Sequence, residues 1–208
     1  MQITQLHETS YKGMFKLTPN SGPAFFARNE YLSSIQLESL AVDTDLSESQ
    51  TDQLLDAGLA CVVELKAVEY LARAEQSRFG LTRKLVQKKY EKKYIDMALD
   101  FLESVDYLSD KRFAEAWLND RRINHFEGSG KLLSELMHRG ISKDVSSKAV
   151  EDFFTENDEF EICKKACMRF QKKGKSDKKL VDALIQAGFS YKMIKEVFEL
   201  NDIKISYD

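Results

Sequence analysis

The chain has 208 residues, of which 43% are hydrophobic and 31% charged, and its formal net charge is −3 at pH 7. This weakly acidic balance argues against a dedicated nucleic-acid binder, which usually carries a basic excess. No apolar run approaches the ~20 residues that a membrane-spanning helix needs. The N-terminus lacks the basic start and apolar core of a signal peptide, and the three cysteines have no disulfide spacing. We therefore expect a charge-rich cytoplasmic protein with no membrane contact.

Residues 1–59 predict a small β-hairpin followed by a short helix. Turn residues between Pro19 and Pro23 separate two short apolar runs, which is a hairpin signal with a long loop. Ser47 and Gln50 have the spacing of a capping box, which marks a helix start. No proline follows Pro23, and since proline breaks helices, the remainder is expected to be almost entirely α-helical.

From about residue 60 onward the sequence repeats itself. Three segments align. Each has a leucine near the end of one helix, and four residues later a position suited to left-handed backbone. An apolar residue follows directly. The aligned triples are Leu85, Leu136 and Leu184; Lys89, Gly140 and Gly188; and Tyr90, Ile141 and Phe189. Lys89 departs from glycine, so we expect the first turn to be looser or differently shaped.

Each repeat also has a longer apolar helix upstream of the aligned segment. Each repeat is therefore predicted to contain three helices. The predicted repeats are residues 60–108, 109–156 and 157–208. A unit of this size cannot bury its apolar face alone, so neighbouring units must stack. The predicted fold class is therefore mainly α, with tandem three-helix repeats in an elongated curved array. Arrays of this kind bind extended partners more often than small substrates.

The middle repeat has an unusual helix that starts near Asp110. Phe113 and Trp117 lie on its apolar stripe, and Arg121 occupies the next position of that stripe. Arg121 can pack on Trp117 and pair with Asp110 or with an acid of a neighbouring repeat, or it can contact a partner. We favour the structural role for Arg121, with Phe113 and Trp117.

Basic residues outside this stripe are the better candidates for partner contact. Arg112 and Arg122 are expected to face outward from the same helix. The segment from Phe170 to Lys179 concentrates lysines, and it is either a solvated turn or an electrostatic contact for phosphate or an acidic protein surface. It has little aromatic character beyond Phe170, which argues against base stacking. The candidates are Arg112, Arg122, Lys131, Arg139, Lys172, Lys173 and Lys175.

No catalytic, metal or cofactor site emerges. Cys163 and Cys167 lie one helical turn apart, but a structural zinc site needs four ligands, so we interpret both as small buried residues. The "GSGK" of residues 128–131 lacks the spacing of a phosphate-binding loop and is interpreted as a helix start with a permissive turn.

Three segments together resemble the RecX family, bacterial regulators of the RecA recombinase. "YLSDKRFAEAW" looks like the family's tyrosine-leucine-aspartate-aspartate-x-arginine-phenylalanine-alanine signature, with Ser109 replacing the first aspartate. "GSGKLLSELMHRGIS" and "RAEQSRFGLTRKL" look like its elements in the middle and first repeats. The ordered combination, with a period of about 50 residues, carries the resemblance; each segment alone could be helix caps and core.

The resemblance implies a non-enzymatic protein without cofactors that binds RecA filaments in their groove. It implies inhibition of strand exchange, ATP hydrolysis and co-protease action, and hence a role in DNA repair, recombination and the SOS response. We expect a monomer with at most weak contact to DNA. The alternative is a single-stranded DNA-binding or architectural module, and a third possibility is a scaffold for another protein.

Overall fold

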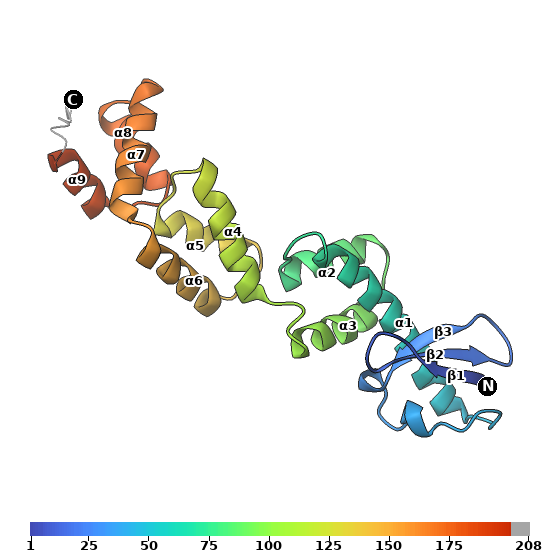
Figure 1. Cartoon of the computed structure of the whole chain (residues 1–208). Coiled ribbons are helices and arrows are strands. Elements are labelled where there is room, and N and C mark those ends of the chain that lie inside the picture. The colour runs from blue at the N-terminus through green and yellow to red at the C-terminus, as the bar shows by residue number, and fades with distance from the viewer. Residues whose placement is uncertain (201–208) are drawn as a thin grey trace. The chain divides into compact units, whose positions relative to one another are not determined.

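The computed structural model describes residues 1–200, apart from the side chain of Asn124 (Figure 1). The chain divides into two compact units, Met1–Ser109 and Asp110–Asp208. Over the described residues there are three β-strands, all in the first unit, and nine α-helices. The predicted fold class, mainly α with a small N-terminal β element, is confirmed; the stacking of all repeats into one curved array stays a prediction.

The N-terminal β element is a three-stranded antiparallel sheet, one strand larger than the predicted hairpin. Its strands, in the spatial order β1-β2-β3, are β1 (Ile3–Glu8), β2 (Met14–Pro19) and β3 (Phe25–Arg28). The predicted loop connects β2 and β3, and β1 adds to the other edge of β2. Leu17 and Ala27 are fully buried on one face of this sheet, against Leu54 of the following helix. The sheet is thus stabilised by a helix, as a small sheet requires.

The predicted short helix is the first half of a long one, α1 (Glu48–Leu71). Its capping box forms as expected, with the Ser47 hydroxyl accepting from the Gln50 amide at 3.2 Å. Gly58 in its middle does not end the helix. A Cβ there would lie 2.9 Å from the Phe25 ring, so glycine permits close packing of β3. The first half of α1 therefore covers the sheet, and the second half joins the helices that follow.

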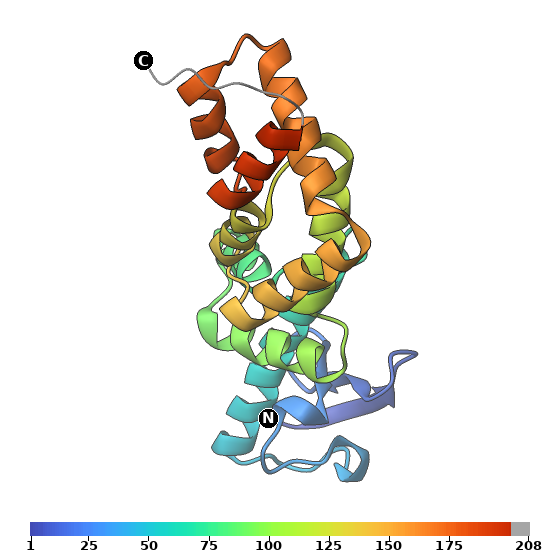
Figure 2. The same cartoon turned by 90° about the vertical axis from the view of Figure 1, so that its left-hand side faces the viewer.

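Three further clusters of buried side chains hold the helices in groups of three (Figures 1 and 2). In the first unit, the end of α1 packs with α2 (Arg78–Gln87) and α3 (Lys92–Ser104). The second unit contains two groups. They are α4 (Asp110–Asn124), α5 (Ser129–His138) and α6 (Lys143–Glu156), and then α7 (Glu159–Lys172), α8 (Asp177–Gln186) and α9 (Tyr191–Leu200).

The middle helix of each group ends in the same turn. The residues with left-handed backbone are Lys89, Gly140 and Gly188, with φ of 66°, 82° and 94°. In each case the next residue donates its N–H to the leucine carbonyl five positions earlier, at 3.2–3.3 Å, which is a Schellman motif. The expectation of a looser first turn is therefore wrong. A non-glycine residue pays about 1–2 kcal/mol for this geometry, and the motif's hydrogen bonds and packing offset it at Lys89.

Glycines join the two helix groups of the second unit. The Gly128 N–H donates to the Ala187 carbonyl at 2.8 Å, and the Gly130 N–H donates to the Gly188 carbonyl at 3.1 Å. A Cβ on Gly128 would lie 2.7 Å from the Gly188 backbone. The "GSGK" glycines are thus needed for close approach of two backbones, a role beyond the predicted permissive turn.

Candidate partner-binding surface

Arg121 is fixed by an aromatic ring and a carboxylate. Its guanidinium carbon lies 5.4 Å from the centre of the Trp117 ring. Its Nε donates to Glu127 Oε2 at 2.7 Å, and a terminal nitrogen donates to Oε1 at 3.0 Å. The pairing raises the pKa of Arg121. The predicted packing on Trp117 is present, but the acid is Glu127 in place of Asp110, because the chain turns back after α4.

A second guanidinium lies over the same ring. Arg139, at the end of α5, has its guanidinium carbon 4.6 Å from the Trp117 ring centre. It donates to Glu135 at 2.6 Å, and the Lys131 ammonium lies 3.1 Å from the other oxygen of Glu135. These hydrogen bonds, first from Arg139 and then from Lys131, lower the pKa of Glu135 to about 2. Lys131 and Arg139 are therefore held in place by one carboxylate.

We call this group the Trp117 cluster; it comprises Trp117, Arg121, Glu127, Lys131, Glu135 and Arg139. The cluster brings together two of the seven predicted contact residues, Lys131 and Arg139. They lie around Arg121 and Trp117, which were predicted to have a structural role. Phe113 packs, as Trp117 does, against the core of α4–α6. Sequence reasoning missed Glu127 and Glu135. The spacing of Lys131, Glu135 and Arg139, four residues apart each time, would have revealed Glu135.

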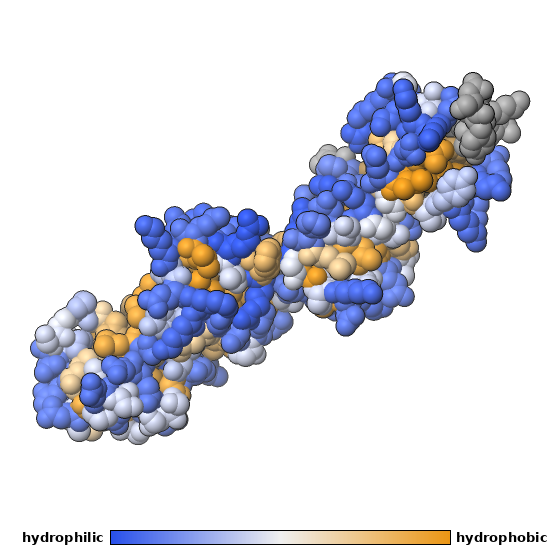
Figure 3. All heavy atoms as spheres, turned by 180° about the vertical axis from the view of Figure 1, so that it is seen from behind, coloured by the Kyte–Doolittle hydropathy of each residue, from blue (hydrophilic) through white to orange (hydrophobic). Residues whose placement is uncertain are grey.

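The other predicted arginines of α4 lie outside the Trp117 cluster. Arg122 is exposed, as expected, and donates to the Asn157 amide oxygen at 3.3 Å. Arg112 is half-buried, so it is less exposed than the sequence predicted, and its role as a contact residue stays a prediction. Arg122 is thus the more accessible of the two. Hydrophilic side chains cover much of the face shown in Figure 3, with hydrophobic ones between them.

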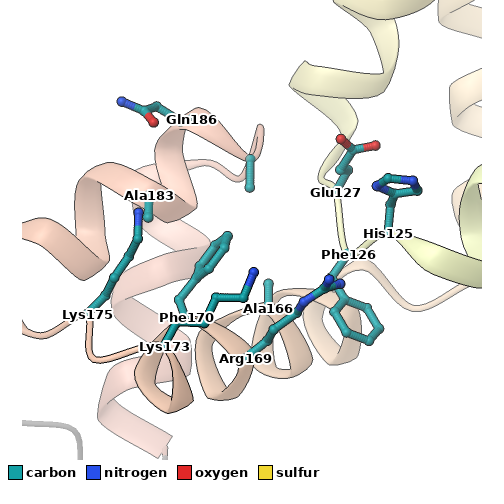
Figure 4. Close-up of a pocket in the computed structure, with 11 residues that line it drawn as sticks. His125, Phe126, Glu127, Ala166, Arg169, Phe170, Lys173, Lys175, Ala183 and Gln186 are labelled. Carbon is teal, nitrogen blue, oxygen red and sulfur yellow. The ribbon is translucent and has the colours of Figure 1, made fainter.

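The predicted basic segment borders a cleft of about 320 Å³ in the second unit (Figure 4). We call it the basic cleft; its lining residues include Phe126, Glu127, Arg169, Phe170, Lys173 and Lys175. Lys172 is exposed and does not line it. Lys173 and Lys175 therefore belong to one recess, while Lys172 is a neighbouring surface charge. Phe126 comes from the α4–α5 connection, and no local sequence signal links it to the lysines.

Glu127 connects the two sites. Its carboxylate pairs with Arg121 in the Trp117 cluster, and the same residue lines the basic cleft beside Phe126. Phe126 in turn packs against the core of α7–α9. Arg121 itself does not line the cleft, but it is paired with a residue that does.

The two cysteines of α7 are buried, as the sequence interpretation expected. Cys163 and Cys167 are 0% and 1% exposed, and burial raises the pKa of Cys163 to about 12, which disfavours the thiolate that binds metal. Across residues 1–200, His, Cys, Asp and Glu do not gather in threes that could hold a metal ion. Within the same range no helix is long and apolar enough to cross a membrane.

Groups of three helices, repeated along the chain with charged clusters on their surface, define a helical-repeat protein. No family model matches the chain. It is 32% identical over 132 residues to regulatory protein RecX of Treponema pallidum (strain Nichols), covering 64% of this chain and 80% of that protein. It is 26% identical over 176 residues to regulatory protein RecX of Listeria welshimeri, covering 82% of this chain and 64% of the relative.

Two solved structures share the fold. A crystal structure of regulatory protein RecX superposes with a TM-score of 0.71 at 20% identity, over 94% of this chain and 98% of the other. RecX from Lactobacillus salivarius gives a TM-score of 0.60, also at 20% identity, over 70% and 98%. The chain belongs to the RecX family of regulatory proteins, and the resemblance seen in the sequence is confirmed.

Proposed function

We propose that this protein binds RecA filaments and inhibits RecA-driven strand exchange, ATP hydrolysis and co-protease action, with no catalysis of its own. The observation that carries the proposal is membership of the RecX family. A role in DNA repair, recombination and the SOS response, a cytoplasmic location and a monomeric state go with it. The division into helix groups also supports it, since repeat proteins bind extended partners along a surface.

The Trp117 cluster supports the proposal as a contact surface. Salt bridges and ring contacts hold Arg121 and Arg139 in fixed orientations, which lowers the entropy lost when a partner binds. Tryptophan and arginine are also the residues most enriched among energetic hot spots of interfaces. Lys131 and Arg139 in the cluster, Arg122 beside it, and the more distant Arg112, Lys172, Lys173 and Lys175 remain the proposed contact residues.

The decisive experiment measures the DNA-dependent ATPase of RecA and its strand exchange with increasing amounts of purified protein. We expect both to fall at substoichiometric ratios of protein to RecA, because blocking one position of a filament affects all RecA subunits that would be added later. Unchanged ATPase and strand exchange at saturating protein would overturn the proposal. Loss of inhibition in the charge reversal Arg139→Glu, with inhibition retained in Lys143→Glu at the exposed start of α6, would place the contact at the Trp117 cluster.

The alternative function, binding of single-stranded DNA in the absence of RecA, has one observation in its favour, the basic cleft. Because the whole chain is weakly acidic, we expect binding to bare strands to be weak and lost between about 50 and 200 mM salt, as phosphate contacts release counterions. Fluorescence anisotropy with a labelled strand measures this. Tight, salt-resistant binding would favour the alternative.

A further inference from the structure

The basic cleft combines two kinds of recognition group in one recess of the second unit. Cationic side chains come from the end of α7 and the turn after it, and aromatic rings come from α7 and the α4–α5 connection (Figure 4). The cationic groups are Arg169, Lys173 and Lys175, and the rings are Phe126 and Phe170. Its volume of about 320 Å³ lies at the lower end of the range for small-molecule sites.

The lining of the cleft carries an excess of positive charge, with Arg169, Lys173 and Lys175 against one carboxylate, that of Glu127. Among residues 1–200, neither Lys173 nor Lys175 has a carboxylate within salt-bridge distance. Glu127 is the acidic residue of the lining, and its carboxylate is already paired with Arg121 at 2.7 Å. The ammonium groups of Lys173 and Lys175 therefore attract an anion, and lysine ammonium groups are suited to phosphate.

The aromatic groups distinguish this recess from a plain anion site. The Arg169 guanidinium carbon lies 5.7 Å from the Phe126 ring centre, and the Lys175 ammonium lies 5.4 Å from that of Phe170. Figure 4 shows Phe170 of α7 and Lys173, the residue after α7, directed into the recess. The planar Arg169 guanidinium beside the Phe126 ring, with Phe170 in the same lining, offers stacking surface for a flat heterocycle, which every nucleobase provides.

We propose that the basic cleft binds one nucleoside phosphate, with the phosphate on Lys173 and Lys175 and the base against Arg169 and the phenyl rings. The nucleotide can be free or part of a single strand. This assignment goes beyond the regulation of RecA, and its test contains no RecA, so either proposal can fail without the other. It also revises the sequence interpretation, which found too few aromatic residues for stacking because Phe126 lies far from the lysines in the chain.

The test follows backbone amide NMR signals of the full-length protein during titration with AMP, inorganic phosphate, and a single-stranded oligonucleotide. We expect AMP to shift the signals of residues 125–127 and 169–175. Removing one phosphate-binding ammonium in Lys173→Ala should weaken AMP about tenfold, the effect of roughly 1.4 kcal/mol. The matched control is Lys172→Ala, which removes the same charge from the adjacent residue outside the cleft and should change the affinity less than twofold.

Each outcome decides the matter. Shifts with AMP, or with the oligonucleotide alone, that depend on Lys173 and not on Lys172 support a nucleotide site and identify the free or the strand form. Equal binding of inorganic phosphate and AMP contradicts the stacking half of the proposal. If Lys173→Ala and Lys172→Ala weaken AMP binding equally, the binding is general electrostatic attraction and the proposed site is contradicted. If a glutamate hexapeptide shifts the same signals and AMP does not, the cleft takes an acidic protein segment and the proposal is overturned.

Discussion

Each unit of the protein contains an arginine that pairs with a glutamate and lies over an aromatic ring, but the two pairs differ in burial. In the first unit, Arg28 of β3 bonds both oxygens of Glu64 of α1 at 2.8–3.0 Å, and its guanidinium lies 4.5 Å from the Phe101 ring centre. Their side chains are 8% and 4% exposed, against 26% and 14% for Arg121 and Glu127.

The surroundings of the buried pair show what burial requires. Arg28 also donates to the Lys12 carbonyl at 2.7 Å, and the Tyr31 hydroxyl donates to Glu64 at 2.9 Å. Burial and the neighbouring Glu64 charge raise the pKa of Tyr31 far above its usual range. Every strong donor and acceptor there has a protein partner, because a buried ion costs several kcal/mol unless it is fully bonded. The Arg121 pair is partly solvated, and water can replace a lost partner.

The largest effect should follow from breaking the buried pair. Arg28→Met leaves Glu64 charged and unpaired between the sheet and α1, and we expect a loss of about 3–5 kcal/mol in the free energy of unfolding. Urea denaturation followed by circular dichroism measures it. The double variant Arg28→Met/Glu64→Leu removes both charges and should regain most of the loss. A loss below about 1 kcal/mol in the single variant would show that Glu64 is solvated.

Breaking the half-exposed pair should cost less. Arg121→Ala removes packing from Trp117 and leaves Glu127 without its partner, and we expect a loss of about 1–3 kcal/mol. Thermal melts measure the stability, and co-sedimentation with RecA filaments measures binding. If Arg121→Ala melts like the unchanged protein but fails to co-sediment, Arg121 contacts the partner directly and its structural assignment is inverted.

The stability that the Trp117 cluster contributes should depend on pH through Glu135. The pKa of Glu135 is lowered to about 2 in the folded protein, below its unfolded value of about 4.3. The unfolded chain takes up the proton first, so the stabilisation is present above about pH 5 and is lost as the pH falls toward 2. With solvent screening of these half-exposed charges, we expect about 1 kcal/mol.

Urea denaturation of the unchanged protein and Glu135→Gln, at pH 7 and again near pH 2.5, isolates this contribution. The unchanged protein should be the more stable at pH 7, and the difference should shrink on acidification. A difference that does not depend on pH would assign the effect to packing of the Glu135 side chain instead of its charge.

The smallest effect on stability belongs to the exposed arginine. Arg122→Glu should change the free energy of unfolding by no more than about 0.5 kcal/mol, as exposed substitutions usually do, while it weakens binding to RecA filaments by reversing a surface charge. Co-sedimentation measures the binding. Lys143→Glu, an equal reversal on another exposed helix start, is the control. Equal weakening in both variants would mean that the net charge matters and the position does not.

Local patterns in the sequence identified the starts and turns of the helices, although the first helix is longer than predicted. The capping box at Ser47 and Gln50 and the leucines before each Schellman turn depend on residues a few positions apart, so the sequence displays them directly. The same periodicity identified the buried face of α4 and the packing of Arg121 on Trp117. The repeat spacing and three ordered motifs carried the family resemblance, which needs residue order and no contact information.

The tertiary structure decided what depends on residues far apart in the chain. It paired Arg28 with Glu64, brought Phe126 beside Lys173, and set Gly128 against the Gly188 backbone. It also selected Glu127 over Asp110 as the partner of Arg121, since that choice depends on how the chain turns after α4. A hydrogen bond or a salt bridge forms only where atoms meet within about 3–4 Å. Residue types and periodicity fix which faces are buried, and folding of the whole unit fixes which side chains meet.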